Sequence, residues 1–156
     1  MPLPSAGLLT YRTNPELQVF LIHPGGPYFA GKDKGVWGVP KGEYNPSENP
    51  LDAAIREFNE ETGFHAAAPF LPLGEIRQRN RKLVTTWAFA GDCDPASLVS
   101  NTCEIDWPPR SGRRIIIPEV DRGGWFSLAE AREFMRPDQH DLLVRLEAVL
   151  ISAPTG

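Results

Sequence analysis

The stretch of sequence that decides the fold is residues 42–64, which read GEYNPSENPLDAAIREFNEETGF. At about 100° per residue, a helix over residues 50–62 places Glu57, Glu60 and Glu61 within an arc of roughly 100°. The neighbouring arc is apolar and consists of Leu51, Ala54, Ile55 and Phe58. This pattern predicts a helix that packs on a sheet and carries its carboxylates along the edge of the core.

Electrostatics alone disfavours these three glutamates. Like charges three or four positions apart on a helix repel by roughly 0.2–0.5 kcal/mol per pair. The helix dipole disfavours exposed anions in the last turns by about 0.3–1 kcal/mol each. A hard divalent cation would reverse the sign of this cost, because it takes oxygen ligands and substrate phosphates together. The cluster by itself leaves two interpretations, a solvated acidic face and a metal-binding face.

The spacing of the whole stretch separates these interpretations. Its constrained positions are Gly42, Glu48, Arg56, Glu57, Glu60, Glu61 and Gly63, followed by the apolar residue Phe64. This pattern resembles the Nudix box at every constrained position, and an accidental match is expected on the order of 10⁻⁷ or less. The chain is therefore similar to the Nudix hydrolases, and the match favours the metal-binding interpretation.

The resemblance implies both a fold and a cofactor. The fold class is α/β, namely a Nudix-type α/β/α sandwich with a mixed sheet. The implied cofactor is Mg²⁺ or Mn²⁺, bound by Glu57 and Glu61 with help from the backbone carbonyl of Gly42. The family pattern gives Glu60 one of two roles, a further metal ligand or an assistant to the attacking water.

Further catalytic candidates surround this set. Arg56 lies four residues before Glu60 and can orient its carboxylate by an ion pair, and Glu48 can brace the loop through Arg56. Glu119 lies in a region that resembles the part of Nudix proteins where an acidic residue binds a further metal or acts as base; Glu104 is the reserve candidate. Clustered carboxylates titrate as a coupled set, so no single glutamate is assigned as the general base.

Residues 35–42, GVWGVPKG, lead directly into the box. The resemblance extends here, since many Nudix enzymes carry a tryptophan and a Pro-Lys-Gly turn at this point. Lys41 is a candidate for binding a phosphate oxygen as a point charge, and the alternative is an exposed turn lysine. Trp37 is a candidate for stacking on a base, and the alternative is a packing role.

Two loops carry the remaining substrate-binding candidates. In loop 24–34, the residues that can face a base or phosphates are Tyr28, Phe29, Lys32 and Lys34. In segment 92–118, Arg113 or Arg114 can reach phosphates. The alternative for this segment is a second hairpin that turns at Ser111-Gly112 and continues into a strand over residues 114–117.

The rest of the chain supplies the expected scaffold. Apolar runs predict strands over residues 5–12 and 17–23 and a hairpin over residues 70–79 and 82–91. A capping box at Ser127 predicts a helix to about residue 135. A second helix is expected from residue 137, with a core-facing stripe made of Leu142, Leu146, Val149 and Leu150.

Composition bounds the class of protein. The 156 residues are 41% hydrophobic and 23% charged, which fits one globular domain over residues 1–156. A net charge of −4 gives no basic field of the kind that binds nucleic acid. We expect neither a secretory signal nor a membrane span, and we expect the two cysteines to be reduced, which makes a cytoplasmic location the default. The oligomeric state is left open.

The predicted function is metal-dependent hydrolysis of a phosphoanhydride bond in a nucleoside diphosphate linked to another moiety. The approach to the box favours dinucleoside polyphosphates of the diadenosine tetraphosphate type, although Glu43 stands where those enzymes often have histidine. With this approach to the box, the chain resembles a poorly characterised bacterial branch of the family. The alternatives are hydrolysis of nucleoside triphosphates or nucleoside diphosphate sugars, and a non-catalytic nucleotide sensor. Sensors commonly lose box carboxylates, and this chain has lost none.

Overall fold

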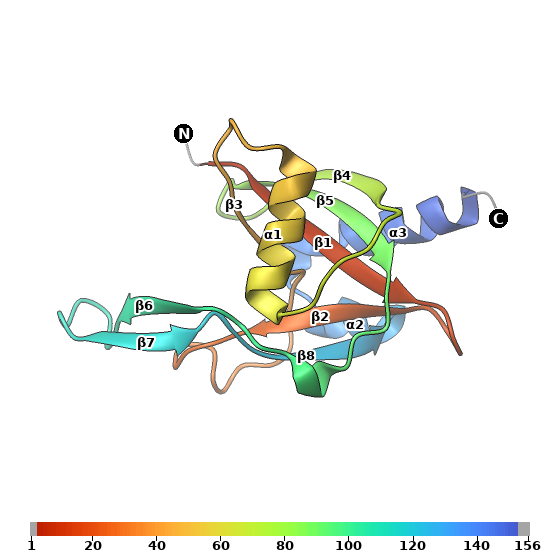
Figure 1. The fold of residues 1–156 in the computed structure, drawn as a ribbon. Coiled ribbons are helices and arrows are strands. Elements are labelled where there is room, and N and C mark those ends of the chain that lie inside the picture. Colours follow the sequence, from red (N-terminus) through yellow and green to blue (C-terminus); the bar gives the residue numbers. More distant parts are fainter. Residues whose placement is uncertain (1–2, 153–156) are drawn as a thin grey trace.

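The computed structural model describes residues 3–152 and is built on a six-stranded mixed sheet (Figure 1). Its strands are β1 (Ser5–Arg12), β2 (Gln18–Pro24), β3 (Lys41–Glu43), β4 (Leu71–Arg77), β5 (Leu83–Ala90) and β8 (Val120–Ser127). The order along the sheet is β4-β5-β1-β2-β8, and β3 also pairs with β1. The pairing of β1 with β5 is parallel and the other pairings are antiparallel.

Helices cover both faces of this sheet. The helix α1 (Pro50–Thr62) lies on one face, and α2 (Leu128–Phe134) and α3 (Asp141–Ser152) lie on the other (Figure 1). The alternation of β1 divides the core, since Leu8 packs in the cluster with Phe58 of α1 while Leu9 packs in the cluster with Leu142 of α3. The expected α/β/α sandwich with a mixed sheet is confirmed.

Both ends of α1 are set by local sequence. The Asn49 side chain accepts a hydrogen bond from the Asp52 N–H at 3.1 Å, and Pro50 fills the first helical position. Gly63 ends the helix in the left-handed region, with a φ of 78°. The last carbonyls are then bound by a distant segment, because Asn101 N–H donates to Glu60 O at 2.7 Å. The carboxyl-terminal turn of α1 is therefore held at a fixed place beside the sheet.

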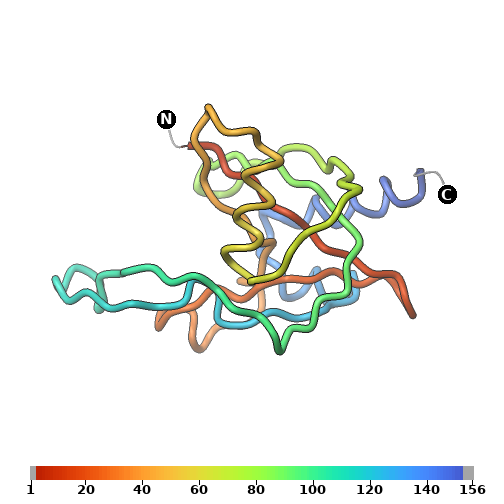
Figure 2. The backbone as a smooth tube through the Cα atoms, in the orientation of Figure 1, coloured from red at the N-terminus to blue at the C-terminus, as the bar shows by residue number. Residues whose placement is uncertain are grey.

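Segment 92–118 contains the second hairpin that the sequence left open. After the short 3₁₀ helix η1 (Pro95–Ser97), the strands β6 (Thr102–Asp106) and β7 (Arg114–Pro118) pair in an antiparallel ribbon. The backbone trace shows that this ribbon extends away from the body of the molecule (Figure 2).

Several element boundaries differ from the sequence-based expectations. β4 and β5 are each shorter than the predicted runs, and the C-terminal helix begins later. The proline after Arg136 starts a separate 3₁₀ turn, η2 (Pro137–Gln139), and α3 follows from Asp141. The capping box at Ser127 is present as predicted. Within residues 3–152, no helix combines the length and apolar character required to cross a membrane.

The left-handed cap of α1 yields a stability prediction. Gly63→Ala should destabilise the protein by about 1–2 kcal/mol, since a side chain at positive φ is strained and its Cβ would meet Val99 O at 3.0 Å. Gly31→Ala is the matched control, because no atom lies within 4 Å of a Cβ there. Urea unfolding of both variants measures the difference, and equal midpoints would contradict the assignment.

Candidate active site

The α1 carboxylates lie where the sequence predicts, at the edge of the core. Glu57 and Glu61 are buried, with exposed fractions of 9% and 7%. Glu60 is more accessible, with 39% of its side chain exposed. Burial of two carboxylates beside a third concentrates negative charge at one end of the helix.

Arg56 supplies the nearest countercharge. Its Nε and Nη2 donate to the two Glu48 oxygens, each at 3.0 Å. Its Nη1 donates to Glu57 Oε1 at 2.9 Å and to Glu60 Oε1 at 3.3 Å. The expected ion pair with Glu60 and the brace to Glu48 are both present, and Arg56 also holds Glu57. One guanidinium thus fixes three carboxylates relative to one another.

Glu61 faces the backbone and side chain of Lys41. The Lys41 N–H donates to Glu61 Oε1 at 3.4 Å. Burial raises the pKa of Glu61 to about 8, with repulsion from Glu119 and Glu57 adding to the effect and attraction to Lys41 opposing it. Burial likewise lowers the pKa of the Lys41 ammonium, and the positive charges of Arg136 and Lys82 act in the same direction. Burial therefore disfavours the charged form of both side chains.

Glu119, just before β8, adds a fourth carboxylate to this acidic group. Its backbone accepts from Gly25 N–H at 2.9 Å and donates to Asn101 O at 3.0 Å. Burial raises its pKa, as does repulsion from Glu60, while a hydrogen bond from the Asn101 side chain lowers it. The reserve candidate Glu104 lies on β6 instead, 3.7 Å from Arg114. Of these two acids, the fold brings only Glu119 to the cavity.

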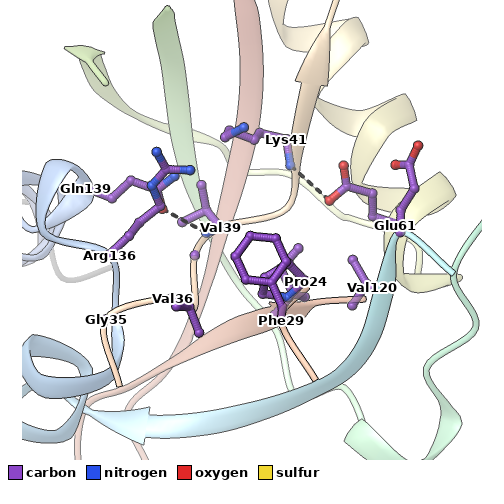
Figure 3. A pocket seen from close by; sticks show the side chains of 13 residues that line it. Pro24, Phe29, Gly35, Val36, Val39, Lys41, Glu61, Val120, Arg136 and Gln139 are labelled. Carbon is purple, nitrogen blue, oxygen red and sulfur yellow. Dashed lines mark hydrogen bonds between the residues drawn. The ribbon is translucent and has the colours of Figure 1, made fainter. Parts of the chain in front are cut away.

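A cavity of about 400 Å³ opens beside these groups. Its walls are formed by Ile22, Pro24, Phe29, Gly35, Val36, Gly38, Val39, Lys41, Glu61, Glu119, Val120, Arg136 and Gln139. Figure 3 shows Glu61 and Lys41 on one side, Arg136 and Gln139 across from Glu61, and the Phe29 ring between them. The cavity therefore combines carboxylates, two cations and an apolar surface.

Three substrate-binding candidates from the sequence lie elsewhere in residues 3–152. Trp37 is buried at 5% exposure, and its Nε1 donates to Asp33 at 2.8 Å, so the packing alternative holds rather than base stacking. Tyr28 is 58% exposed and its ring stacks under the Lys32 ammonium, not on the cavity wall. Arg114 lies on the ribbon. None of these three side chains lines the cavity.

Arg136 and Gln139 are cavity residues that the sequence did not indicate. Arg136 donates from Nε and Nη2 to the Asp138 carboxylate at 2.6 and 2.7 Å. Gln139 accepts from Val39 N–H at 3.0 Å and donates to Gln78 at 2.9 Å. The only signal in the sequence is a polar run, RPDQ, between two helices. Whether these polar residues reach the cavity depends on where η2 lies in the fold.

The carboxylates fit a divalent cation by donor type and charge. Within residues 3–152, no three acidic, histidine or cysteine side chains are already gathered around one point. The hard oxygen donors are present, however, and burial, with added repulsion between the carboxylates, raises the pKa of Glu57 and of Glu61. Gly42 lies so close to the Glu57 carboxylate that a Cβ there would collide with it, which explains the glycine. Glu57, Glu61 and Glu60 are the residues that would hold the ion.

Comparison with known proteins decides the family. The family model for the NUDIX domain matches residues 1–146. The chain belongs to the Nudix family. This Nudix hydrolase has its box on the loop and helix that carry the clustered carboxylates, as the resemblance predicted.

Solved structures share the fold of this Nudix hydrolase at low sequence identity. An Ap4A hydrolase from C. elegans superposes with a TM-score of 0.66 and 21% identity, covering 94% of this chain and 98% of that one. The NUDIX domain of Shewanella oneidensis NrtR, complexed with ADP ribose, gives a TM-score of 0.67 and 15% identity, covering 96% and 89%. These likenesses establish the fold.

A curated relative matches over a shorter stretch. The m7GpppN-mRNA hydrolase dcap-2 of Caenorhabditis elegans is 63% identical over 38 residues, which is 24% of this chain and 4% of that protein. The similarity is therefore confined to a short part of a much longer protein.

The raised pKa of Glu61 predicts a pH-dependent stability. Between 4.5 and about 8, the folded protein holds a proton on Glu61 that the unfolded chain releases, so metal-free protein loses stability as pH rises. The loss is at most about 1.4 kcal/mol per pH unit. Glu61→Gln should flatten this decline, although Glu57 and Glu119 contribute in the same direction.

Thermal unfolding from pH 5 to pH 8 in chelator measures this effect. At pH 8, added Mg²⁺ should raise the Tm of the wild type more than that of Glu61→Gln, because the ion replaces the proton as counterion. Identical pH slopes for both proteins would contradict the assignment.

Proposed function

We propose that this Nudix hydrolase cleaves a phosphoanhydride bond in a nucleoside diphosphate linked to a second moiety, with Mg²⁺ or Mn²⁺ as cofactor. Dinucleoside polyphosphates of the diadenosine tetraphosphate type are the preferred substrates in this proposal. The observation that carries it is the cavity itself, whose lining combines Glu61 and Glu119 with Lys41, Arg136 and apolar side chains. Such a site can bind phosphates, a metal ion and a base together.

The cations would bind the phosphate chain. Lys41 is largely desolvated, which makes its ammonium a strong partner for an anion. Arg136 is held in place by two bonds to Asp138, and Asp138 in turn accepts from Arg79 N–H at 2.8 Å. A guanidinium fixed in this way binds a phosphate with little loss of side-chain freedom.

The apolar wall would bind one nucleoside. Phe29, Val36 and Ile22 contribute to this surface, and Gln139 adds an amide. A cavity of about 400 Å³ is near the lower end for small-molecule sites and accommodates one nucleoside with part of its phosphate chain. The second moiety would then extend beyond the cavity, which suits a substrate in which two groups are joined by phosphates.

The names of two relatives support the same substrate class. Ap4A joins two nucleosides through four phosphates, and m7GpppN joins two through three phosphates. In both, a chain of phosphates carries a nucleoside at each end. We propose a substrate with this shared feature for the present chain.

The reaction adds one water molecule across a P–O–P bridge. A new P–O bond forms in line with the leaving phosphate as the bridging P–O bond breaks, and the bridging oxygen departs on the leaving phosphate. The water gives a proton to a carboxylate of the coupled set of Glu57, Glu60, Glu61 and Glu119. Lys41 and Arg136 bind the phosphate oxygens. Arg56 orients the carboxylates of Glu57 and Glu60 by hydrogen bonds to both. A bound divalent ion would supply charge neutralisation at the phosphates.

A hydrolysis panel tests the function. In Mg²⁺, dinucleoside polyphosphates should turn over faster than nucleoside triphosphates and nucleotide sugars, with products identified by chromatography. Glu61→Gln should fold and lose about 100-fold or more of kcat, since an essential carboxylate is removed. Glu104→Gln, on the exposed ribbon, is the matched control and should behave as wild type. Turnover of none of these substrates in protein that binds Mg²⁺ would favour the sensor alternative.

Arg136 gives a separate prediction on substrate affinity. Arg136→Gln should raise KM by roughly 10–100-fold, the loss expected for a charge-assisted hydrogen bond, while kcat changes far less. Arg132→Gln is the control, because Arg132 pairs with Glu147 on the surface. Equal KM values for the two variants would remove Arg136 from the phosphate site.

A further inference from the structure

His23 is a fully buried histidine with a polar partner at each ring nitrogen. It lies near the end of β2 with 0% exposure, and its ring packs edge-on against Trp37 with centroids 5.2 Å apart. Nδ1 lies 2.9 Å from Asp121 Oδ1, and Nε2 lies 2.7 Å from the backbone carbonyl of Lys32. Burying such a ring is costly unless both nitrogens are satisfied, and here both are.

The partners define what each nitrogen does. A backbone carbonyl only accepts, so Nε2 carries a hydrogen and donates it to Lys32 O. The Asp121 carboxyl holds Nδ1 and thereby fixes the plane of the ring. His23 therefore acts as a rigid donor, aimed by Asp121 at one carbonyl of the neighbouring loop.

Asp121 reaches His23 because of an irregularity in the sheet. In the pairing of β2 with β8, His23 is opposite Arg122 while Pro24 is opposite Val120. Asp121 is thus the extra residue of a β-bulge. Bulges redirect side chains and occur often beside active sites. This one directs the Asp121 carboxylate to the imidazole.

The carbonyl that His23 binds belongs to the loop that forms one cavity wall. The loop over residues 25–35 is tied at its start by the Gly25 N–H bond to Glu119 O at 2.9 Å. His23 ties it again at Lys32. Between these points lies Phe29, whose ring faces the cavity (Figure 3). The other polar contacts of this loop with the rest of the protein lie after Lys32, where Asp33 Oδ1 accepts from Trp37 Nε1 at 2.8 Å and Lys34 pairs with Glu133. His23 therefore supplies the anchor that is nearest to Phe29 in the chain.

We propose that His23 is a positioning residue for substrate binding. Through the Lys32 carbonyl it fixes the loop over residues 25–35, and so holds Phe29 where the nucleoside packs; Asp121 orients His23 for this task. The inference rests on the proposed function for its effect on substrate, but the tie between His23 and the loop is a property of the protein alone.

A matched pair of amide substitutions tests this role. The Nε2 of glutamine occupies nearly the place of histidine Nε2, so His23→Gln retains the donor to Lys32 O. The Nδ2 of asparagine corresponds to histidine Nδ1, so His23→Asn retains only the contact with Asp121. Both variants bury one amide in the same site, and each retains one of the two contacts of the imidazole.

The expected result is a split between the two variants. His23→Asn should raise KM about tenfold with kcat within about twofold of wild type, while His23→Gln stays within about threefold on KM. Combining His23→Asn with Phe29→Ala should add little to the KM effect of Phe29→Ala, because both act through one wall. Equal KM values for the two His23 variants, or additive effects in the double variant, would overturn the proposal.

Amide hydrogen exchange supplies a readout that needs no substrate. The loop contains bonds from Lys32 N–H to Phe29 O at 2.9 Å and from Ala30 N–H to Pro27 O. These amides should exchange about tenfold faster in His23→Asn and at the wild-type rate in His23→Gln. Unchanged exchange in both variants would refute the tie itself, whereas faster exchange without any measurable turnover in wild type would refute only the proposed function.

Asp121→Ala keeps the test decisive if the His23 variants do not fold. Asp121 is partly exposed, with 31% of its side chain accessible, so its truncation is tolerated more easily. Loss of the orienting carboxylate should raise KM and loop exchange in the same direction as His23→Asn. A folded Asp121→Ala protein with wild-type values in both measurements would contradict the proposal.

Discussion

Burial of the α1 glutamates against the sheet is the constraint on which the rest of the site depends. The apolar arc of the helix must pack on β1 and β5, and this draws Glu57 and Glu61 out of water. Desolvation raises their pKa values. Two basic residues contact these carboxylates: Arg56, within the helix, donates to Glu57, and the backbone N–H of Lys41, in β3, donates to Glu61. The same desolvation that weakens the helix makes it receptive to a divalent ion.

The cavity walls come from parts of the chain that are far apart, and few bonds join them. Asn101 connects two of the parts, since its N–H caps the Glu60 carbonyl while its own carbonyl accepts from Glu119 N–H. A single residue therefore joins the end of α1 to Glu119, which immediately precedes β8. Gln139 does the same on the opposite wall, where it joins η2 to Val39 and to Gln78. The acidic wall is thus positioned by the backbone of Asn101, and the cationic wall by the side chain of Gln139.

The sequence predicts those parts of the site that are local. Glu57, Glu60, Glu61 and Arg56 share one helix, so their spacing determines their geometry, and Lys41 follows because it adjoins the box. Arg136, Gln139 and His23 were not predicted, because their roles depend on which strands and turns meet across the sheet. Trp37 shows the opposite case, a residue that the sequence suggested for the site. A tryptophan is suited to stacking on a base, but the packing of His23 and Phe126 against its ring shows that this one is buried.

The parallel pairing of β1 with β5 has a consequence for the order of folding. Ser5 lies opposite Val84, so this pairing joins residues 79 positions apart, since 84 − 5 = 79. Everything between them, including α1 and β3, is enclosed in that closure. Contacts of such long range form late and slowly, and until they form α1 has no complete surface on which to pack. Recovery of catalysis during refolding therefore reports the closing of this long loop, not the earlier appearance of helix.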